Sequence, residues 1–267
     1  MIHQISFPGL HLSFSINRVA FEVFGIPVYW YGLLIATGVI LAVLYGNFAA
    51  KREGLSQDDF FNMVLFSVPV AIICARLYYV MFSWEMYRDD LFSILDIRSG
   101  GLAIYGGIIG ICLVIFFYCK KKKLSIGMVL DVLAVGLLIG QAIGRWGNFM
   151  NGEAYGSATH LPWAMTIEKY GKMVAESVHP TFLYESLWNA VGIAVLLCYR
   201  KFCKFRGELF CGYLCWYGLG RVWIEGLRAD SLYIGMFRVS QLLAGATLLL
   251  GLGIILYQRS KIKNGCV

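Results

Sequence analysis

Residues 29–50 read YWYGLLIATGVILAVLYGNFAA, an apolar stretch that contains no Asp, Glu, Lys or Arg. A helix needs roughly 20 apolar residues to cross the hydrocarbon core of a bilayer. Comparable runs follow at about 60–82, 101–119, 127–149, 181–199, 208–227 and 238–257. Together they fill most of the chain. We therefore expect an all-α integral membrane protein of about seven transmembrane helices, in which residues 1–267 form a single integral membrane domain.

The composition agrees with a membrane protein. Charged residues make up 15% of the chain, whereas a soluble globular domain contains about 25%. The residues before the first apolar run contain no basic region or small-residue cleavage site, so we expect no secretory signal peptide. None of the eight cysteines falls in a predicted outer loop, so we expect no disulfide framework. Metal-ligand spacing is also missing, and we expect neither a metal nor a cofactor.

The distribution of Lys and Arg between alternate loops predicts the orientation, because basic residues collect on the cytoplasmic side. One set of loops holds thirteen: Lys51, Arg52, Lys120, Lys121, Lys122, Lys123, Arg200, Lys201, Lys204, Arg206, Arg259, Lys261 and Lys263. The other set holds six: Arg18, Arg88, Arg98, Lys169, Lys172 and Arg228. We expect the N-terminus outside and the C-terminus in the cytoplasm. Most of the +7 formal charge is then explained by the basic cytoplasmic loops that orient the protein in the membrane. We therefore do not expect nucleic-acid binding.

Polar residues gather at the predicted outer ends of the spans. Ionisable side chains in hydrocarbon are costly, so they usually face a cavity or a partner and are candidate site residues. The set comprises Tyr31, Arg76, Tyr105, Arg145, Asn148, Asn151, Glu153, His179, Arg221, Glu225 and Arg228. The inner halves carry little comparable, and Asp131 is the clearest exception. We expect a site at the level of the outer headgroups.

Local spacing refines this expectation. Arg221, Glu225 and Arg228 share one helix face at i, i+4 and i+7. A salt-bridged stripe would explain Glu225, but two arginines beside one carboxylate leave cationic capacity for an anion. Arg145 and Asn148 also share a face. A guanidinium grips a phosphodiester bidentately, and a phospholipid headgroup is the nearest such anion. The residues thus favour a protein that handles phospholipid, without naming a reaction.

Small residues recur at four-residue steps in two of the runs. Gly136, Gly140 and Gly144 precede Arg145, and Gly106 and Gly110 repeat the pattern in the third run. Such spacing lets helices approach closely, so we interpret these glycines as packing residues. His179 followed by Pro180 indicates the start of a helix, in preference to an acid or base.

Residues 144–156, GRWGNFMNGEAYG, resemble the signature of the prolipoprotein diacylglyceryl transferase family. Further motifs are similar in the same order along the chain. These are Trp30-Tyr31-Gly32, Ala75-Arg76-Leu77-Tyr78-Tyr79, Gly100-Gly101-Leu102 with Tyr105-Gly106-Gly107, His179-Pro180-Thr181 with Leu183-Tyr184-Glu185, and Tyr217-Gly218-Leu219-Gly220-Arg221 with Glu225 and Arg228. The resemblance covers essentially the whole chain.

The resemblance implies a reaction in the bacterial cytoplasmic (inner) membrane, at a site toward the outer leaflet. The family moves the diacylglyceryl group of phosphatidylglycerol to the lipobox cysteine of signal-peptide-bearing prolipoproteins, with glycerol 1-phosphate released. The partners implied are therefore phosphatidylglycerol, prolipoproteins and membrane lipid. Carried over residue by residue, catalysis would involve Arg145, Arg221, Glu225 and Tyr105. Substrate binding would involve Tyr31, Arg76, Asn148, Asn151, Glu153, Gly156 and Arg228.

One position departs from the family pattern. Many members carry His where this chain has Tyr105, and that His has been assigned as the base that activates the thiol. Tyrosine is a poor base near neutrality, because a phenol ordinarily titrates near pH ~10. Either Tyr105 orients a substrate by a hydrogen bond, or the arginines lower the pKa of the thiol directly. We favour the second.

Two other classes of function remain open from the residues themselves. A lipid or anion transporter would also use arginines within the membrane, although it should show polar access from both faces. A purely structural protein fits less well with so many costly residues. A different phospholipid-using enzyme is a further alternative, but neither an aspartate-rich phosphotransferase motif nor a Gly-x-Ser-x-Gly nucleophile is present in the sequence.

Overall fold

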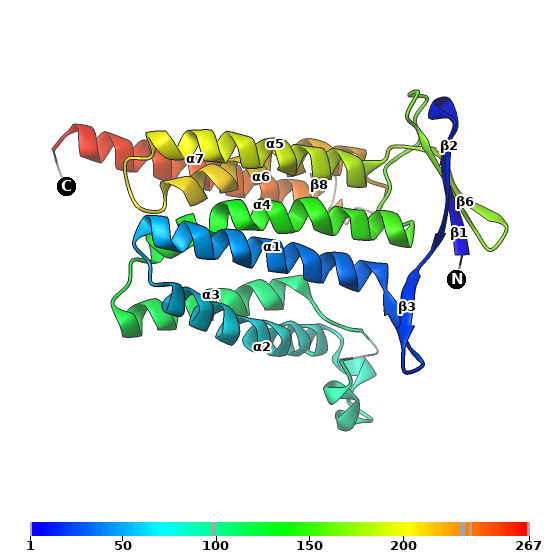
Figure 1. Cartoon of the computed structure of the whole chain (residues 1–267), viewed down its shortest axis with the longest axis horizontal. Helices are drawn as coiled ribbons and strands as arrows, with labels where there is room; N and C mark the ends of the chain where they lie inside the picture. Colours follow the sequence, from blue (N-terminus) through cyan, green and yellow to red (C-terminus); the bar gives the residue numbers. More distant parts are fainter. Residues whose placement is uncertain (1, 98–99, 230–232, 235–236, 266–267) are drawn as a thin grey trace. The chain divides into compact units, whose positions relative to one another are not determined.

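The computed structural model describes residues 2–97, 100–229, 233–234 and 237–265 (Figure 1). Arg98, one of the six basic residues assigned to the outer loops, lies outside them. Seven long helices occur within the described residues: α1 (Trp30–Glu53), α2 (Gln57–Phe82), α3 (Ile104–Lys122), α4 (Ile126–Asn151), α5 (Thr181–Tyr199), α6 (Glu208–Leu227) and α7 (Val239–Lys263). Each coincides with one predicted apolar run, so the helical, membrane-type architecture is confirmed.

The number of spans is confirmed only in part. Six helices in the described part of the chain are long and apolar enough to cross a membrane, and α6 is not among them. Its sequence contains Glu208, Arg221 and Glu225, which lower its hydropathy. The seventh span and the orientation of the termini stay predictions.

The helices and strands divide into two compact units. The first contains Met1–Tyr45 and Leu133–Val267, and the second contains Gly46–Val132. Each is described by itself below, and the single-domain organisation stays a prediction.

The first unit contains a small sheet that the sequence analysis did not predict. Its antiparallel strands lie in the order β2-β1-β5-β6, with bounds β1 Ile2–Phe7, β2 Leu12–Asn17, β5 Met165–Lys169 and β6 Lys172–Val178. A separate hairpin, β3 (Val19–Val23) and β4 (Ile26–Tyr29), leads directly into α1. A third pair, β7 (Tyr233–Ile234) and β8 (Phe237–Arg238), precedes α7.

The sheet packs on the ends of α4 and α5, as Figure 1 shows. Its buried residues Ile5, Phe7 and Ile167 belong to the same apolar cluster as Phe149 of α4 and Phe182 of α5. The Phe149 and Phe182 rings lie 4.8 Å apart, centroid to centroid. This apolar cluster holds the sheet against the ends of α4 and α5. It therefore also holds in place the residues that lie beside it at those helix ends.

Reciprocal side-chain contacts set the register of α4, α5 and α6. Trp188 of α5 and Trp216 of α6 stack at 4.4 Å, and each indole N–H donates to the backbone carbonyl of the other residue. On the other side of α5, the Trp146 indole donates to the Ser186 hydroxyl at 3.1 Å, and that hydroxyl donates to the carbonyl of Ala142. Residues 145, 185 and 221 stand next to these contacts.

The glycines act as packing residues, as predicted. In the first unit, a Cβ at Gly136 would lie 3.2 Å from the carbonyl oxygen of Ala42 in α1. In the second unit, a Cβ at Gly110 would lie 2.9 Å from the carbonyl oxygen of Val70 in α2. Side chains at these positions would push the helices apart.

Candidate functional site

Three arginines of the first unit converge on one carboxylate. Glu185 of α5 pairs with Arg145 of α4 at 2.6 Å, with Arg221 of α6 at 3.3 Å and with Arg228 at 3.7 Å. Its side chain is 9% exposed, and the arginine side chains are 12–27% exposed. The sequence analysis expected Arg145 and Arg221 to act together, and the structure brings them to the same acceptor. One negative charge is thus shared by three guanidinium groups.

Glu225 holds Arg221 from the opposite side. The two side chains pair at 2.8 Å along α6, in the predicted i, i+4 arrangement, and Glu225 is only 3% exposed. The guanidinium of Arg238 donates to the backbone carbonyl of Glu225, and the Arg228 N–H donates to the same carbonyl at 3.2 Å. Arg221 is therefore fixed between two carboxylates. This arrangement suits a positioning role for Glu225.

Glu185 was not among the site residues that we predicted. It appeared only as part of the Leu183-Tyr184-Glu185 motif. The rule that selected Arg145 and Arg221 would have selected it as well, because Glu185 is an ionisable residue inside an apolar run. It is buried one turn from the start of α5, where it joins three arginines from elsewhere in the sequence.

A chain of hydrogen bonds leads from Arg145 toward the sheet. Arg145 donates to the Asn148 side-chain oxygen at 3.3 Å, and the Asn148 amide donates to Glu153 at 3.2 Å. Asn151 donates to the same Glu153 oxygen at 3.1 Å. Arg18, just before β3, donates to Asn151 at 3.3 Å. The structure thus joins Asn148, Asn151 and Glu153, all three predicted as substrate-binding residues, into one polar relay.

Gly156 connects the ends of α5 and α6. Its N–H donates to the carbonyl of His179, and the next N–H, of Ser157, donates to the carbonyl of Leu227. A Cβ at Gly156 would lie 2.7 Å from the Cβ of His179 and 2.8 Å from the Leu227 oxygen. The glycine therefore permits the close approach that places Arg228. Helix α5 begins at Thr181, directly after His179 and Pro180, which confirms that this pair marks a helix start.

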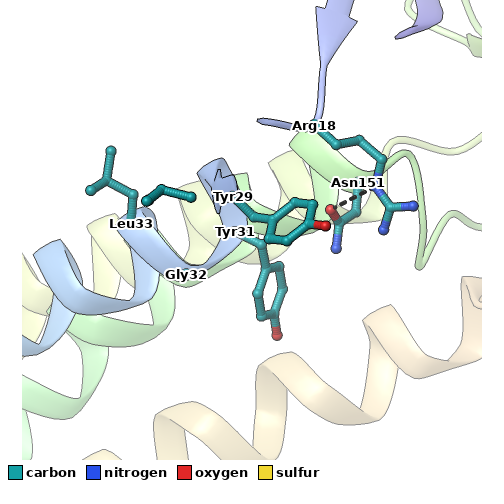
Figure 2. Close-up of a pocket in the computed structure, with 7 residues that line it drawn as sticks. Arg18, Tyr29, Tyr31, Gly32, Leu33 and Asn151 are labelled. Carbon is teal, nitrogen blue, oxygen red and sulfur yellow. Dashed lines mark hydrogen bonds between the residues drawn. The ribbon is translucent and has the colours of Figure 1, made fainter. Parts of the chain in front are cut away.

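Tyr31 lies beside an open pocket of about 420 Å³ at the start of α1. Figure 2 shows Arg18 and Tyr29 turned toward Asn151, with the Tyr31 ring pointing in another direction. The Tyr31 ring also packs against α4, because a Cβ at Gly147 would lie 2.9 Å from it. Of the predicted site residues, Tyr31 and Asn151 line this pocket.

Arg76, which we predicted to bind substrate, has a different environment. It lies in the second unit, where its guanidinium makes five hydrogen bonds of 2.8–3.1 Å to the carbonyls of Ser93, Ile94, Asp96, Gly100 and Gly101. An arginine has five N–H donors, so every donor is in use. These contacts indicate that Arg76 organises the loop between α2 and α3.

The two glycines of that loop are needed for these contacts. Gly100 and Gly101 have φ values of +95° and +73°, a region in which side chains are strained. A Cβ at Gly101 would collide with the Arg76 guanidinium. The Gly100-Gly101 motif is therefore explained by the fold of the loop around Arg76.

Tyr105 also belongs to the second unit. It is the second residue of α3, is 49% exposed, and its ring lies 6.4 Å from that of Tyr78. Its participation in a common site with Arg145 and Arg221 stays a prediction.

A second buried polar cluster lies at the start of α6, in the half of this helix that we predicted to be the inner one. It corrects our expectation that the predicted inner halves carry little beyond Asp131. Glu208 is fully buried. It accepts from the Tyr199 hydroxyl at 2.9 Å, from the Lys204 N–H at 2.5 Å and from Arg259 of α7 at 2.6 Å. Since Glu208 and Arg259 are far apart in sequence, spacing within one helix gave no sign of this pair.

Glu185 and the three arginines around it, Arg145, Arg221 and Arg228, form a group that we call the Glu185 cluster. This cluster is chemically suited to bind an anion. Because Arg145 and Arg221 share Glu185, they can offer donors and positive charge to a phosphate, which guanidinium groups recognise through paired hydrogen bonds. The same groups would stabilise charge that develops on a departing phosphate. The sharing of one carboxylate by three arginines is the strongest chemical feature of the unit.

Comparison with known proteins agrees with this chemistry. The family model described as prolipoprotein diacylglyceryl transferase matches residues 18–257. Relatives named phosphatidylglycerol–prolipoprotein diacylglyceryl transferase include that of Finegoldia magna, 47% identical over 93% of this chain and 98% of the relative. That of Lysinibacillus sphaericus is 44% identical over 94% and 96%, and that of Enterococcus faecalis is 46% identical over 92% and 91%. The chain therefore belongs to the prolipoprotein diacylglyceryl transferase family.

Proposed function

We propose that this enzyme transfers the diacylglyceryl group of phosphatidylglycerol to the lipobox cysteine of a prolipoprotein and releases glycerol 1-phosphate. Membership of the family supports the reaction class. The observation that carries the proposal is the sharing of Glu185 by Arg145, Arg221 and Arg228, with the shortest pair at 2.6 Å. Such a cluster fits the phosphodiester of an anionic phospholipid.

In the proposed chemistry, the phosphodiester binds to Arg145 and Arg221. The cysteine thiol loses its proton to solvent, and the thiolate attacks the glyceryl carbon that bears the phosphate ester. A carbon–sulfur bond forms while the carbon–oxygen bond breaks, and the phosphate oxygen leaves with the electron pair. The arginines stabilise this charge, and their field lowers the pKa of the incoming thiol.

Other residues would hold the reacting groups in place. Glu225 fixes Arg221, at 2.8 Å. Asn148 orients Arg145, from which it accepts a hydrogen bond, and Tyr31 contacts the headgroup from the pocket that it lines. Holding reactants in this way lowers the entropic part of the barrier.

We also propose the setting of the reaction. The enzyme would span the bacterial cytoplasmic membrane seven times, with α6 as the sixth span and the N-terminus outside. The burial of Arg221 and Glu225 supports α6 as a span, because paired charges are tolerated inside a helix bundle. The Glu185 cluster would then face the outer leaflet.

A reconstituted transfer assay tests this proposal. Purified protein is mixed with phosphatidylglycerol labelled in its acyl chains and a lipobox peptide, and the peptide mass and released glycerol 1-phosphate are measured. The expected result is one diacylglyceryl group per cysteine and one glycerol 1-phosphate per transfer. A peptide with serine in place of cysteine is the control. Release of glycerol 1-phosphate without peptide modification, or no transfer at all, would contradict the proposal.

A further inference from the structure

The pocket at the start of α1 has one strongly basic residue that the proposed chemistry does not use. Arg18 lines it together with Tyr29, Tyr31, Asn151 and the apolar side chains of Val28 and Leu33. A cationic and hydroxyl-bearing rim over an apolar wall matches the boundary between a phospholipid headgroup and its chains. All these residues belong to the first unit.

The guanidinium of Arg18 is only partly engaged. Its Nε donates to the neutral side-chain oxygen of Asn151 at 3.3 Å, the contact drawn as a dashed line in Figure 2. Within residues 2–97, 100–229, 233–234 and 237–265, no carboxylate lies within ion-pair distance of Arg18. Its positive charge is therefore available to a ligand without competition from a carboxylate, whereas Arg145 and Arg221 share Glu185.

Two further basic residues lie near Asn151. Lys169 and His3 flank Gly152, next to Asn151, because a Cβ at Gly152 would lie 3.1 Å from Lys169 Cε and 3.3 Å from the His3 ring. Burial lowers the pKa of Lys169, and the charge of Arg18 lowers it further, while Glu153 raises it. Burial also lowers the pKa of His3, with Lys169 and Arg18 adding to the effect. Arg18 and Lys169 thus bring two basic side chains close to Asn151, where Glu153 is the nearby carboxylate.

We propose that Arg18 is a further substrate-binding residue, which holds a glycerophosphoryl group in this pocket, apart from the Glu185 cluster. The inference rests on the proposed function for the identity of that group. The relay Arg18–Asn151–Glu153–Asn148–Arg145 connects the two places. The group is either the headgroup of phosphatidylglycerol on its way in or glycerol 1-phosphate on its way out.

Binding measurements on the full-length protein in neutral detergent test the inference. The probes are glycerol 1-phosphate and short-chain phosphatidylglycerol, titrated without peptide. The test variant is Arg18→Gln, which keeps an N–H donor for Asn151. The matched control is Lys172→Gln, which removes one positive charge from an exposed position in the hairpin that also carries Lys169. Thermal unfolding without ligand checks that both variants are folded, and Arg18→Lys serves as a second variant that retains the charge.

We expect Arg18→Gln to weaken binding of at least one probe about tenfold, as for one charged hydrogen bond, and Arg18→Lys to weaken it less. Weakened binding of both probes assigns the site to the free product as well, and weakened binding of the lipid alone assigns it to the headgroup. In the transfer assay, KM for the lipid should rise while kcat stays within about twofold. Equal binding by Arg18→Gln and Lys172→Gln would overturn the inference. Because binding is measured without transfer, a failure of the proposed reaction would be seen separately.

Discussion

Helix α6 carries a buried carboxylate cluster at each end, and the two clusters differ in their balance of charge. At its start, Glu208 has donors for its oxygens from Tyr199, the Lys204 backbone and Arg259. Toward its end, Arg221 belongs to a group in which Glu185 is shared by three arginines. In the first cluster, one arginine, Arg259, pairs with one carboxylate, Glu208. In the second, three arginines pair with two carboxylates, Glu185 and Glu225.

The difference distinguishes a structural ion pair from a binding site. Buried charges are common in both, so burial alone does not indicate function. The one-to-one pair of Glu208 and Arg259 joins α6 to α7, whereas Arg145 and Arg221 share Glu185 and can also bind an anion. Arg76 resembles the structural pair at the start of α6, because all five of its N–H groups donate to backbone carbonyls.

The largest effect is expected from Arg145→Lys or Arg221→Lys. Lysine keeps the charge but loses the planar fork that binds phosphate through two bonds. The transfer rate should fall by about 10²–10³, as when one charge-stabilising donor is removed. Initial rates with saturating peptide measure this. Near-normal turnover of either variant would remove the distinction between the two ends of α6.

A smaller loss is expected from Tyr105→Phe. If the hydroxyl only orients a substrate, its removal costs about one hydrogen bond, roughly tenfold in rate. The pH–rate profile should then follow the thiol of the peptide in both proteins. A loss beyond about a thousandfold in a folded variant would instead give Tyr105 a part in proton transfer.

Arg76→Lys should alter stability more than rate. Lysine has three donors in place of five, so at least two loop carbonyls lose their partner. We expect a free energy of unfolding lower by about 2 kcal/mol and a transfer rate within a few fold of the parent. Chemical denaturation and the transfer assay separate the two quantities. A large rise in KM for the lipid at unchanged stability would instead support the original prediction that Arg76 binds substrate.

The smallest effect on rate is expected from Glu208→Gln. The amide keeps the size of the side chain but loses the ion pair with Arg259, and the unfolding temperature should fall by several degrees. The rate per folded molecule should equal that of the parent. If this variant loses activity as Arg221→Lys does, the comparison between the two ends of α6 is wrong.

Much of the helical framework could be predicted, because a membrane span is a local property of about 20 residues. All seven helices lie where the apolar runs indicated. The sheet was missed, because β1 pairs with β5 across more than a hundred residues and its strands are only five to seven residues long. Short strands that pair at long range leave a weak local pattern.

The candidate site was predicted unevenly for a related reason. Arg221 and Glu225 share a helix face, so their pairing was visible as an i, i+4 spacing. The contacts of Glu185 with Arg145 and Arg221 join three helices, and sequence spacing carries no information about them. The saturation of Arg76 by carbonyls was likewise hidden, because backbone acceptors are the same in every residue.

The central claim is that the Glu185 cluster binds the phosphate of the lipid, and equilibrium binding tests it most directly. Phosphatidylglycerol and diacylglycerol, which lacks the phosphate, are titrated against the parent, Arg221→Lys and Glu208→Gln without peptide. We predict that the parent and Glu208→Gln prefer phosphatidylglycerol to the same degree, and that Arg221→Lys loses about tenfold of this preference. An undiminished preference in Arg221→Lys, or an equal loss in Glu208→Gln, would contradict the account.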